Sequence, residues 1–306
     1  MDASQFQLLY RRDGIVKISS TTNDQLYKLP SSTDIKSLAD EVLRTGSAIR
    51  VIETSENILV SMPGAALGDA PVVETRRVVS RIENFVSFNK HWTDLCVTGG
   101  ALSAIVGLVC ADDGDDTEPW CLYKEKLNIK PPGSGGFAAH LDTPSLRVTG
   151  LCDRFVTVMI AIDDMTADNG CLQVCRGAWS EDASLPCDDI HETGTGSNPD
   201  GNGRRGSIAS ASVSQLQWES IECKSGDVYI FSGWLPHKSA SNTTNQPRRA
   251  VFLTYNHSED GELEETYYRI MRDMRSAYAK QLIIQQGGRE KPIHVELGKS
   301  TAAPKV

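Results

Sequence analysis

The sequence has few of the features that mark nucleic-acid-binding or membrane proteins. Its 306 residues include 31 Lys and Arg against 40 Asp and Glu, which gives a formal net charge of -9. A phosphate backbone selects for a basic surface, so this balance argues against a nucleic-acid partner. The most apolar stretch, residues 101–111, is about half of the roughly 20 residues that cross a bilayer. We therefore expect no membrane partner.

Signals for export and for disulfides are also missing. The first residues, MDASQFQLLYRRDG, lack a basic segment followed by an apolar run, so they do not resemble a secretory signal. The eight cysteines are scattered, without the paired CxxC spacing of a structural zinc site. They are typical of buried, reduced thiols. We expect a cytoplasmic protein.

The composition, 40% hydrophobic and 23% charged, is that of a globular protein. We expect a single domain over 1–306, divided into parts that differ in periodicity. Apolar residues at helical spacing predict helices over 35–46, 75–92, 95–109 and 264–281. The expected parts are a mainly helical N-terminal part (1–119), a β-rich core (120–256) with a loop insertion (176–215), and a C-terminal helix and tail (257–306).

The β-rich part contains short alternating segments separated by turn signals. The segments are 121–130, 136–142, 154–163, 170–174, 226–233 and 248–256. Several strands at close spacing without intervening helices indicate an antiparallel sandwich or barrel. The glycines of 194–207 match no phosphate-binding motif. We interpret that stretch as a flexible loop and leave open a role as a lid.

Four residues in this part form a pattern with chemical meaning. His140 and Asp142 make an HxD motif at a strand end, His237 follows 95 residues after Asp142, and Arg248 comes 11 residues after His237. Two imidazoles and one carboxylate hold one face of an octahedral Fe(II) and leave three positions for a bidentate keto acid and O2. An arginine can fork onto the far carboxylate of that keto acid. The alternative is two core histidines and a surface arginine.

These motifs resemble the phytanoyl-CoA-dioxygenase-like branch of the Fe(II)/2-oxoglutarate oxygenases. The resemblance covers residues 123–256 and is carried by YKEKLNIKPPGSGGFAAHLD, NGCLQV and GDVYIFSGWLPHKSASNTTNQPRRAVFLTYN. It implies a double-stranded β-helix, which is a cupin-like jelly roll, with His140, Asp142 and His237 as catalytic iron ligands. It implies 2-oxoglutarate and O2 as cosubstrates and Arg248 as the anchor of 2-oxoglutarate. Arg249 competes for that role, but strand alternation places it on the opposite face.

The resemblance extends to a hydroxyl and to one face of a strand. Ser239 matches a small hydroxyl residue that contacts the same carboxylate. Alternation places Lys124, Lys126, Asn128 and Lys130 on one face of 121–130. In one member of the family the residue that corresponds to Asn128 contacts 2-oxoglutarate, and those that correspond to Lys124 and Lys126 contact substrate. The alternative for the two lysines is an edge strand that uses them against aggregation.

Some departures from the family bear on the substrate. Leu141 stands where much of the family has Gln, so a polar contact there is lost, whereas Asp142 argues against a related halogenase. No coenzyme-A-binding signature is visible, so phytanoyl-CoA is not the expected substrate. Phe137 and Trp234, close to the two histidines, could line the pocket or the core.

The resemblance implies an Fe(II)/2-oxoglutarate-dependent dioxygenase that hydroxylates an aliphatic C–H bond of a small molecule in specialised metabolism. One alternative is a hydroxylase of an aminoalkylphosphonate or a similar small acidic metabolite. Another is a non-catalytic cupin-like binding module, which would be expected to have lost one of the four residues. The oligomeric state stays open, with a homodimer as one option.

Overall fold

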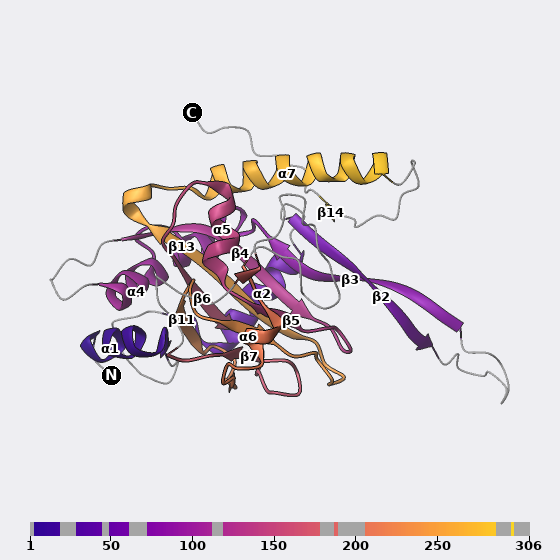
Figure 1. The fold of residues 1–306 in the computed structure, drawn as a ribbon, viewed down its shortest axis with the longest axis horizontal. Coiled ribbons are helices and arrows are strands. Elements are labelled where there is room, and N and C mark those ends of the chain that lie inside the picture. The colour runs from indigo at the N-terminus through magenta and orange to yellow at the C-terminus, as the bar shows by residue number, and fades with distance from the viewer. Residues whose placement is uncertain are drawn as a thin grey trace.

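Two antiparallel sheets face each other in the computed structural model, with helices packed on the outer face of the larger sheet (Figure 1). The structure describes residues 3–18, 29–44, 49–60, 72–111, 119–177, 187–188, 206–285 and 295–296. The sandwich architecture predicted from the alternating segments is confirmed, and it is the jelly roll that the resemblance implied.

The helices are α1 (Ala3–Asp13), α2 (Ser32–Arg44), η1 (Val86–Phe88), α3 (Lys90–Cys96), α4 (Ala101–Cys110), α5 (Asp142–Leu146), η2 (Arg147–Thr149), α6 (Ser210–Val213), η3 (Ser258–Asp260) and α7 (Glu264–Gln285). The larger sheet has the order β1 (Ile15–Ile18), β11 (Val228–Ser232), β6 (Phe155–Ala161), β13 (Arg248–His257), β4 (Trp120–Lys130), β3 (Val72–Glu83), β2 (Ile49–Val60) and β14 (Val295–Glu296). The smaller sheet has the order β10 (Glu219–Ile221), β7 (Leu172–Val174), β12 (His237–Ser239), β5 (Phe137–His140), β9 (Ser207–Ile208) and β8 (Cys187–Asp188).

The two layers follow from side-chain alternation along the larger sheet. On β6, Val156, Val158 and Ile160 belong to the core cluster that also contains buried residues of α1, α2, α3 and α4. Met159 and Ala161 point the other way, into the cluster between the two sheets. Both faces of β6 are therefore buried, which explains its nearly continuous apolar sequence.

β4 is an interior strand of the larger sheet. Asn128 lies opposite Ala250 of β13 on one side and opposite Arg81 of β3 on the other. The explanation of Lys126 as protection of an exposed edge is therefore wrong, because β3 pairs with β4 over 126–128, whereas Lys124 lies outside that pairing. Their face of β4 is turned toward the smaller sheet, so Lys126 needs another explanation.

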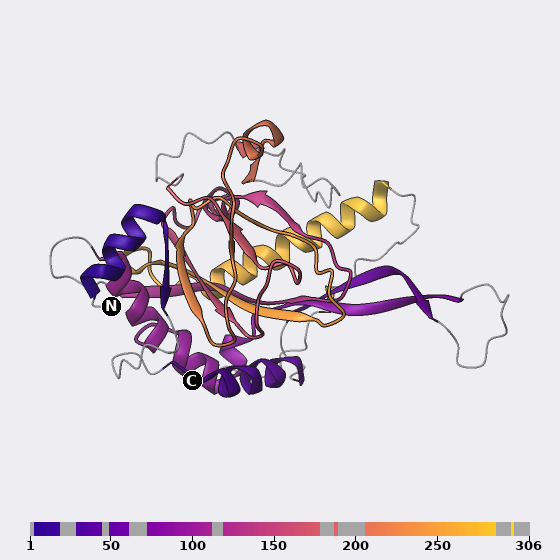
Figure 2. The same ribbon diagram turned by 90° about the horizontal axis from the view of Figure 1, so that it is seen from below.

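The prediction of a helix over 75–92 is wrong. Its first half belongs to β3, and its second half forms η1 and α3. Valines and isoleucines at 72, 73, 78, 79 and 82 suit a strand, and β3 completes its hydrogen bonding against β2 and against β4 at residues 81–83. Figures 1 and 2 show the β2–β3 hairpin reaching out from the body of the protein.

The helix predicted over 95–109 begins later than expected. α3 ends at Cys96, and α4 starts at Ala101 after Gly99, whose φ of 85° interrupts the helix. The segment Lys90–Cys110 is long and apolar enough to cross a membrane by composition, with half of its apolar window buried in the protein. Buried residues of both helices belong to the core cluster under the larger sheet, as in the core helix of a globular protein.

Other predicted elements agree more closely. The helix predicted over 35–46 is α2, the tail helix is α7, and each of the six predicted strand segments contains an observed strand. The N-terminal part is less helical than expected, because β1, β2 and β3 all join the larger sheet, which thus extends beyond 120–256. Of the stretch 194–207, for which a lid role was left open, residues 194–205 lie outside the described residues. The seven cysteines with described side chains are free thiols, as predicted.

A buried carboxylate joins β4 to the helices behind it. Glu125 is 1% exposed, and its Oε1 accepts hydrogen bonds from the backbone N–H of Phe85 (2.6 Å) and Val86 (2.9 Å). Its Oε2 accepts one from the hydroxyl of Tyr268 on α7 (2.9 Å). Burial and the neighbouring Glu264 raise the pKa of Glu125 to about 8. This side chain therefore holds η1 and α7 against the strand that lines the site.

Replacing Glu125 tests this role. Glu125→Ala leaves the buried N–H groups of Phe85 and Val86 unpaired, whereas the hydroxyl of Tyr268 keeps its bond to the backbone carbonyl of residue 125. The change is expected to lower the free energy of unfolding by about 3 kcal/mol. Glu125→Gln keeps an acceptor at Oε1 and is expected to cost less than half as much. The measurement is urea denaturation of both variants and the wild type. An Ala variant as stable as the wild type would contradict this role.

Candidate metal centre

The smaller sheet brings two histidines together. His140 is the last residue of β5 and His237 the first of β12. The two strands pair antiparallel with His237 opposite His140. Asp142 lies two residues beyond the end of β5, at the first position of α5, and Leu141 between them is extended (φ -112°, ψ 141°), so Asp142 lies on the same side of the chain as His140, as alternation predicts.

The three side chains converge on one point. The Nε2 atoms of His140 and His237 lie 3.8 and 3.9 Å from the same oxygen, Oδ1 of Asp142. The ring centroids of the two histidines are 4.1 Å apart. One ligand atom from each residue lies within 4.8 Å of the others. This spacing suits three ligands on one face of a single ion.

Backbone carbonyls fix the tautomer of both rings. Nδ1 of His140 lies 2.7 Å from the carbonyl oxygen of Ala138, and Nδ1 of His237 lies 3.0 Å from that of Leu235. A carbonyl can only accept, so each Nδ1 carries the hydrogen and each neutral ring has its lone pair on Nε2. Both lone pairs are therefore available at the shared point.

The carboxylate is oriented in the same way. Thr157 on β6 is 1% exposed, and its hydroxyl donates to Oδ2 of Asp142 at 2.9 Å. Oδ2 is thus occupied, and Oδ1 faces the two histidines. Asp142 is therefore placed to supply one oxygen to a metal.

The charges of the three side chains favour metal binding. Burial and the neighbouring His237 lower the pKa of His140 to about 3, so its ring is neutral near pH 7. Burial raises the pKa of Asp142, but His237 and Lys126 lower it by more, and the net pKa is well below the usual range. Metal ligands must be deprotonated, and these two already are. Two neutral imidazoles and one carboxylate on one face fit Fe(II).

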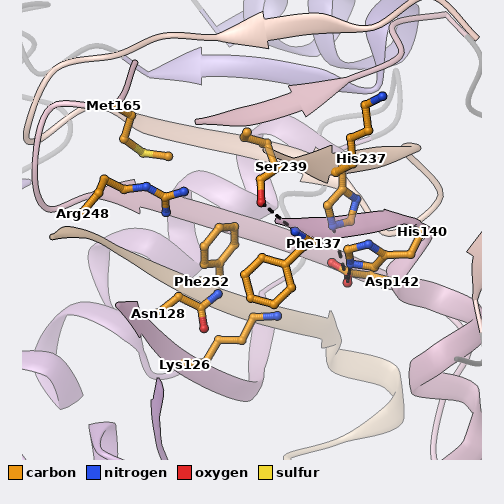
Figure 3. A pocket seen from close by; sticks show the side chains of 12 residues that line it. Lys126, Asn128, Phe137, His140, Asp142, Met165, His237, Ser239, Arg248 and Phe252 are labelled. Carbon is orange, nitrogen blue, oxygen red and sulfur yellow. Dashed lines mark hydrogen bonds and ion pairs between the residues drawn. The ribbon is translucent and has the colours of Figure 1, made fainter. Parts of the chain in front are cut away.

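A cavity runs from this cluster to Arg248 (Figure 3). It is lined by Lys126, Asn128, Phe137, His140, Asp142, Met165, Leu172, His237, Lys238, Ser239, Arg248 and Phe252. In Figure 3 the His–Asp–His cluster lies at one end, Arg248 lies at the other, and Ser239 lies between them. β4, β12 and β13 thus contribute facing walls of one cavity.

Arg248 is a buried cation without a carboxylate partner among the described residues. It is 4% exposed, and Nη2 donates to the carbonyl oxygen of Gly170. Its Nε has no hydrogen-bond partner, and burial lowers its pKa to about 10. A buried, unpaired charge is costly. The side chain is therefore placed to bind an anion that enters the cavity.

Arg249 differs from Arg248 as alternation predicts. Its guanidinium bonds Asp163 at 2.8 and 2.9 Å and also pairs with Asp40 of α2. An arginine already paired with two carboxylates is not available to an incoming anion. Arg248 is therefore the better candidate for the anchor.

The other predicted residues divide into two groups. Asn128, Ser239 and Lys126 line the cavity, as does Phe137. The side-chain oxygen of Asn128 is buried without a hydrogen-bond partner, which leaves it available to a ligand. Lys124 is not among the lining residues and holds its ammonium 5.7 Å from the ring centre of Tyr267.

Trp234 is not part of the cavity wall. It packs against the cluster of Ala139, Leu141 and Ile208 beside the His–Asp–His cluster. Leu141, the departure from the family noted above, is fully buried there. Its apolar side chain fills the space behind the HxD motif.

Some functional positions were missed from the sequence. Phe252 lies four residues after Arg248 and so faces the cavity by alternation, a signal that was available. Thr157 is a hydroxyl within the apolar segment FVTVMIA, which could have marked a buried polar contact. Met165 and Leu172 come from a separate turn and strand, and no spacing in the sequence links them to the histidines, whereas Lys238 directly follows His237 on β12.

The sequence model of the phytanoyl-CoA dioxygenase (PhyH) family matches residues 66–250 of this chain. A 2-aminoethylphosphonate dioxygenase from uncultured bacterium HF130_AEPn_1 is 32% identical over 64% of this chain and 66% of its own length. A methylphosphonate hydroxylase from Gimesia maris is 38% identical over 53% of this chain and 54% of its own length. The chain therefore matches less than two thirds of the length of each relative.

Solved structures share the fold. EctD from S. alaskensis, crystallised with 2-oxoglutarate and 5-hydroxyectoine, is 18% identical with a TM-score of 0.56, over 85% of this chain and 77% of its own. The epimerase SnoN from nogalamycin biosynthesis, described as non-heme and alpha-ketoglutarate-dependent, is 14% identical with a TM-score of 0.53. The match covers 84% of this chain and 83% of SnoN. At these identities the likeness establishes the architecture alone.

The hydrogen bond from Thr157 can be tested through metal affinity. Thr157→Val keeps the shape of the side chain but leaves Oδ2 of Asp142 unpaired, and we expect affinity for Mn(II) to fall about tenfold. Thr157→Ser should stay close to the wild type. The measurement is an anaerobic Mn(II) titration followed by electron paramagnetic resonance.

Thr254 offers a matched control, because it lies opposite Thr157 on the neighbouring strand β13. Thr254→Val is expected to leave Mn(II) affinity unchanged. Equal losses in the two valine variants would mean that the hydrogen bond to Asp142 is not the cause.

Proposed function

The chain belongs to the phytanoyl-CoA dioxygenase (PhyH) family, and from that premise we propose that it is an Fe(II)- and 2-oxoglutarate-dependent dioxygenase. The reaction is oxidation, in the simplest case hydroxylation, of an aliphatic C–H bond of a small molecule. One observation supports this most strongly. A three-ligand cluster and a buried, unpaired guanidinium occupy opposite ends of the same cavity.

2-Oxoglutarate has two ends that match these two features. Its keto acid can chelate a metal held by His140, Asp142 and His237, and its far carboxylate can accept the fork of Arg248. The amide of Asn128, whose NH2 group can donate, and the hydroxyl of Ser239 line the space between. When bound, iron would supply O2 activation coupled to the conversion of 2-oxoglutarate to succinate and CO2.

The residues of this chain supply geometry and a dry environment. The backbone of Ala138 and Leu235 holds the ring orientations, and Thr157 holds the carboxylate. Arg248 fixes one end of the cosubstrate, which limits the positions of the other end. Apolar side chains in the cavity wall exclude water from the reacting atoms; these are Phe137, Met165, Leu172 and Phe252.

We propose a small acidic molecule, with phosphonates the first class to test, as the substrate. Lys126 lines the cavity, and it is close enough to Asp142 to lower the pKa of that carboxylate. Its ammonium lies 5.4 Å from the ring centre of Phe252. A cation at this position can neutralise an acidic substrate group close to the metal. The names of the two phosphonate-oxidising relatives support the same class.

The two adjacent arginines provide a matched test of the anchor. Arg248→Ala is expected to raise the KM for 2-oxoglutarate by at least about 30-fold, because a charge-assisted contact is lost. Arg249→Ala should change this KM by less than about threefold, since its side chain is paired with Asp163 and Asp40 on the other face. The measurement is succinate release at varied 2-oxoglutarate. If both substitutions raised the KM equally, Arg248 would not be the anchor of 2-oxoglutarate.

Removing the charge of Lys126 tests the substrate class. Lys126→Met is expected to lower kcat/KM for an acidic substrate by about tenfold or more, because one charge-assisted contact is lost. The KM for 2-oxoglutarate should stay nearly constant, which serves as the internal control. The measurement is succinate release across aminoalkylphosphonates, alkylphosphonates, carboxylates and neutral amines. A preference for neutral substrates in the wild type would contradict this assignment.

A further inference from the structure

A buried lysine stands behind the wall of the cavity. Lys130 is the last residue of β4 and is 4% exposed. Its Nζ donates to Oγ of Ser239 at 2.9 Å and to the carbonyl oxygen of Ala240. Ser239 lines the cavity and Lys130 does not. Lys130 therefore reaches a ligand in the cavity by hydrogen bonding only through its neighbours.

The hydrogen bonds of Ser239 leave its hydroxyl hydrogen for the cavity. An ammonium has no acceptor, so Oγ of Ser239 accepts from Lys130. It also accepts from the backbone N–H of Phe137 at 3.3 Å. These two bonds use both lone pairs of the hydroxyl. No hydrogen bond from this hydroxyl to a described residue is present, so its hydrogen is free to point toward the cavity that Ser239 lines.

The surroundings keep two cations close together at this end. Lys130 lies directly opposite Arg248 in the pairing of β4 with β13. Burial and Arg248 lower the pKa of Lys130 to about 7. A carboxylate that binds in the cavity would favour the charged form of both side chains. With the anion present, Nζ is an ammonium that can only donate.

The backbone at Gly170 keeps space for both cations. Its carbonyl accepts from Arg248, and its φ is +73°. A Cβ at this position would lie 2.9 Å from Nζ of Lys130 and 2.4 Å from the carbonyl oxygen of Ala240. A residue with a side chain would therefore displace the contact of Lys130 with the segment that carries Ser239.

We propose that Lys130 is a positioning residue that turns the hydroxyl hydrogen of Ser239 toward the far carboxylate of 2-oxoglutarate, so that Ser239 and Arg248 bind it together. The inference rests on the proposed function, because it takes 2-oxoglutarate as the ligand. It goes beyond that function by assigning a role to a residue that does not touch the ligand.

A double-mutant cycle tests the proposal through binding rather than turnover. Wild type, Lys130→Met, Ser239→Ala and the double variant are titrated anaerobically with 2-oxoglutarate in the presence of Fe(II). The visible charge-transfer band gives the Kd. We expect Lys130→Met to raise the Kd on the order of tenfold in the wild-type background and less than about twofold in the Ser239→Ala background. Lys224→Met, a change at an exposed lysine paired with Asp164, is the control and should leave the Kd unchanged.

Lys130→Gln is a second variant in case the methionine disturbs the fold. Its amide keeps an N–H donor, so the Kd should lie between those of the wild type and Lys130→Met. Equal effects of Lys130→Met in both backgrounds, or no effect in either, would overturn the role of Lys130 and leave the proposed function intact. A wild type that gives no band would overturn the proposed function and this inference together.

Discussion

The antiparallel pairing of β5 with β12 is the constraint on which the site depends. It sets His237 opposite His140, and for each histidine the carbonyl two residues earlier in the chain holds Nδ1 of the ring. Both lone pairs then point at the same place without help from other side chains. The chain leaves β5 and turns into α5 at Asp142, so the third ligand arrives at the shared point through the same local structure. A shift of this register would separate all three.

A second constraint is electrostatic. The chain as a whole carries a net charge of -9, yet the cavity and its wall hold Arg248, Lys130 and Lys126. Burying such cations costs free energy, and the pKa values of all three are lowered accordingly. That cost is offset when an anion binds, because the charges need not reorganise. The acidic composition therefore describes the outside of the molecule, and the site has the opposite character.

Much of this arrangement could be predicted from the sequence, because strand alternation alone fixes which face a side chain takes. It placed Asn128 and Lys126 on the cavity side and separated Arg248 from Arg249. The prediction failed for 75–92, where valines and isoleucines fit helical and extended spacing equally well. There the segment forms a strand because it pairs with β4 at residues 81–83. Thr157 and Lys130 could not be assigned from spacing, since their contacts with Asp142 and Ser239 exist only after the two sheets pack.

The central claim is that one cavity holds a metal at the His–Asp–His end and an anion at the Arg248 end. Anaerobic addition of Fe(II) and 2-oxoglutarate to the protein tests it most directly, because the visible metal-to-ligand charge-transfer band requires both in contact. We expect the band with the wild type and its loss in His140→Ala, with the fold retained by circular dichroism. A wild type without the band, or a His140→Ala variant with the band undiminished, would contradict the claim.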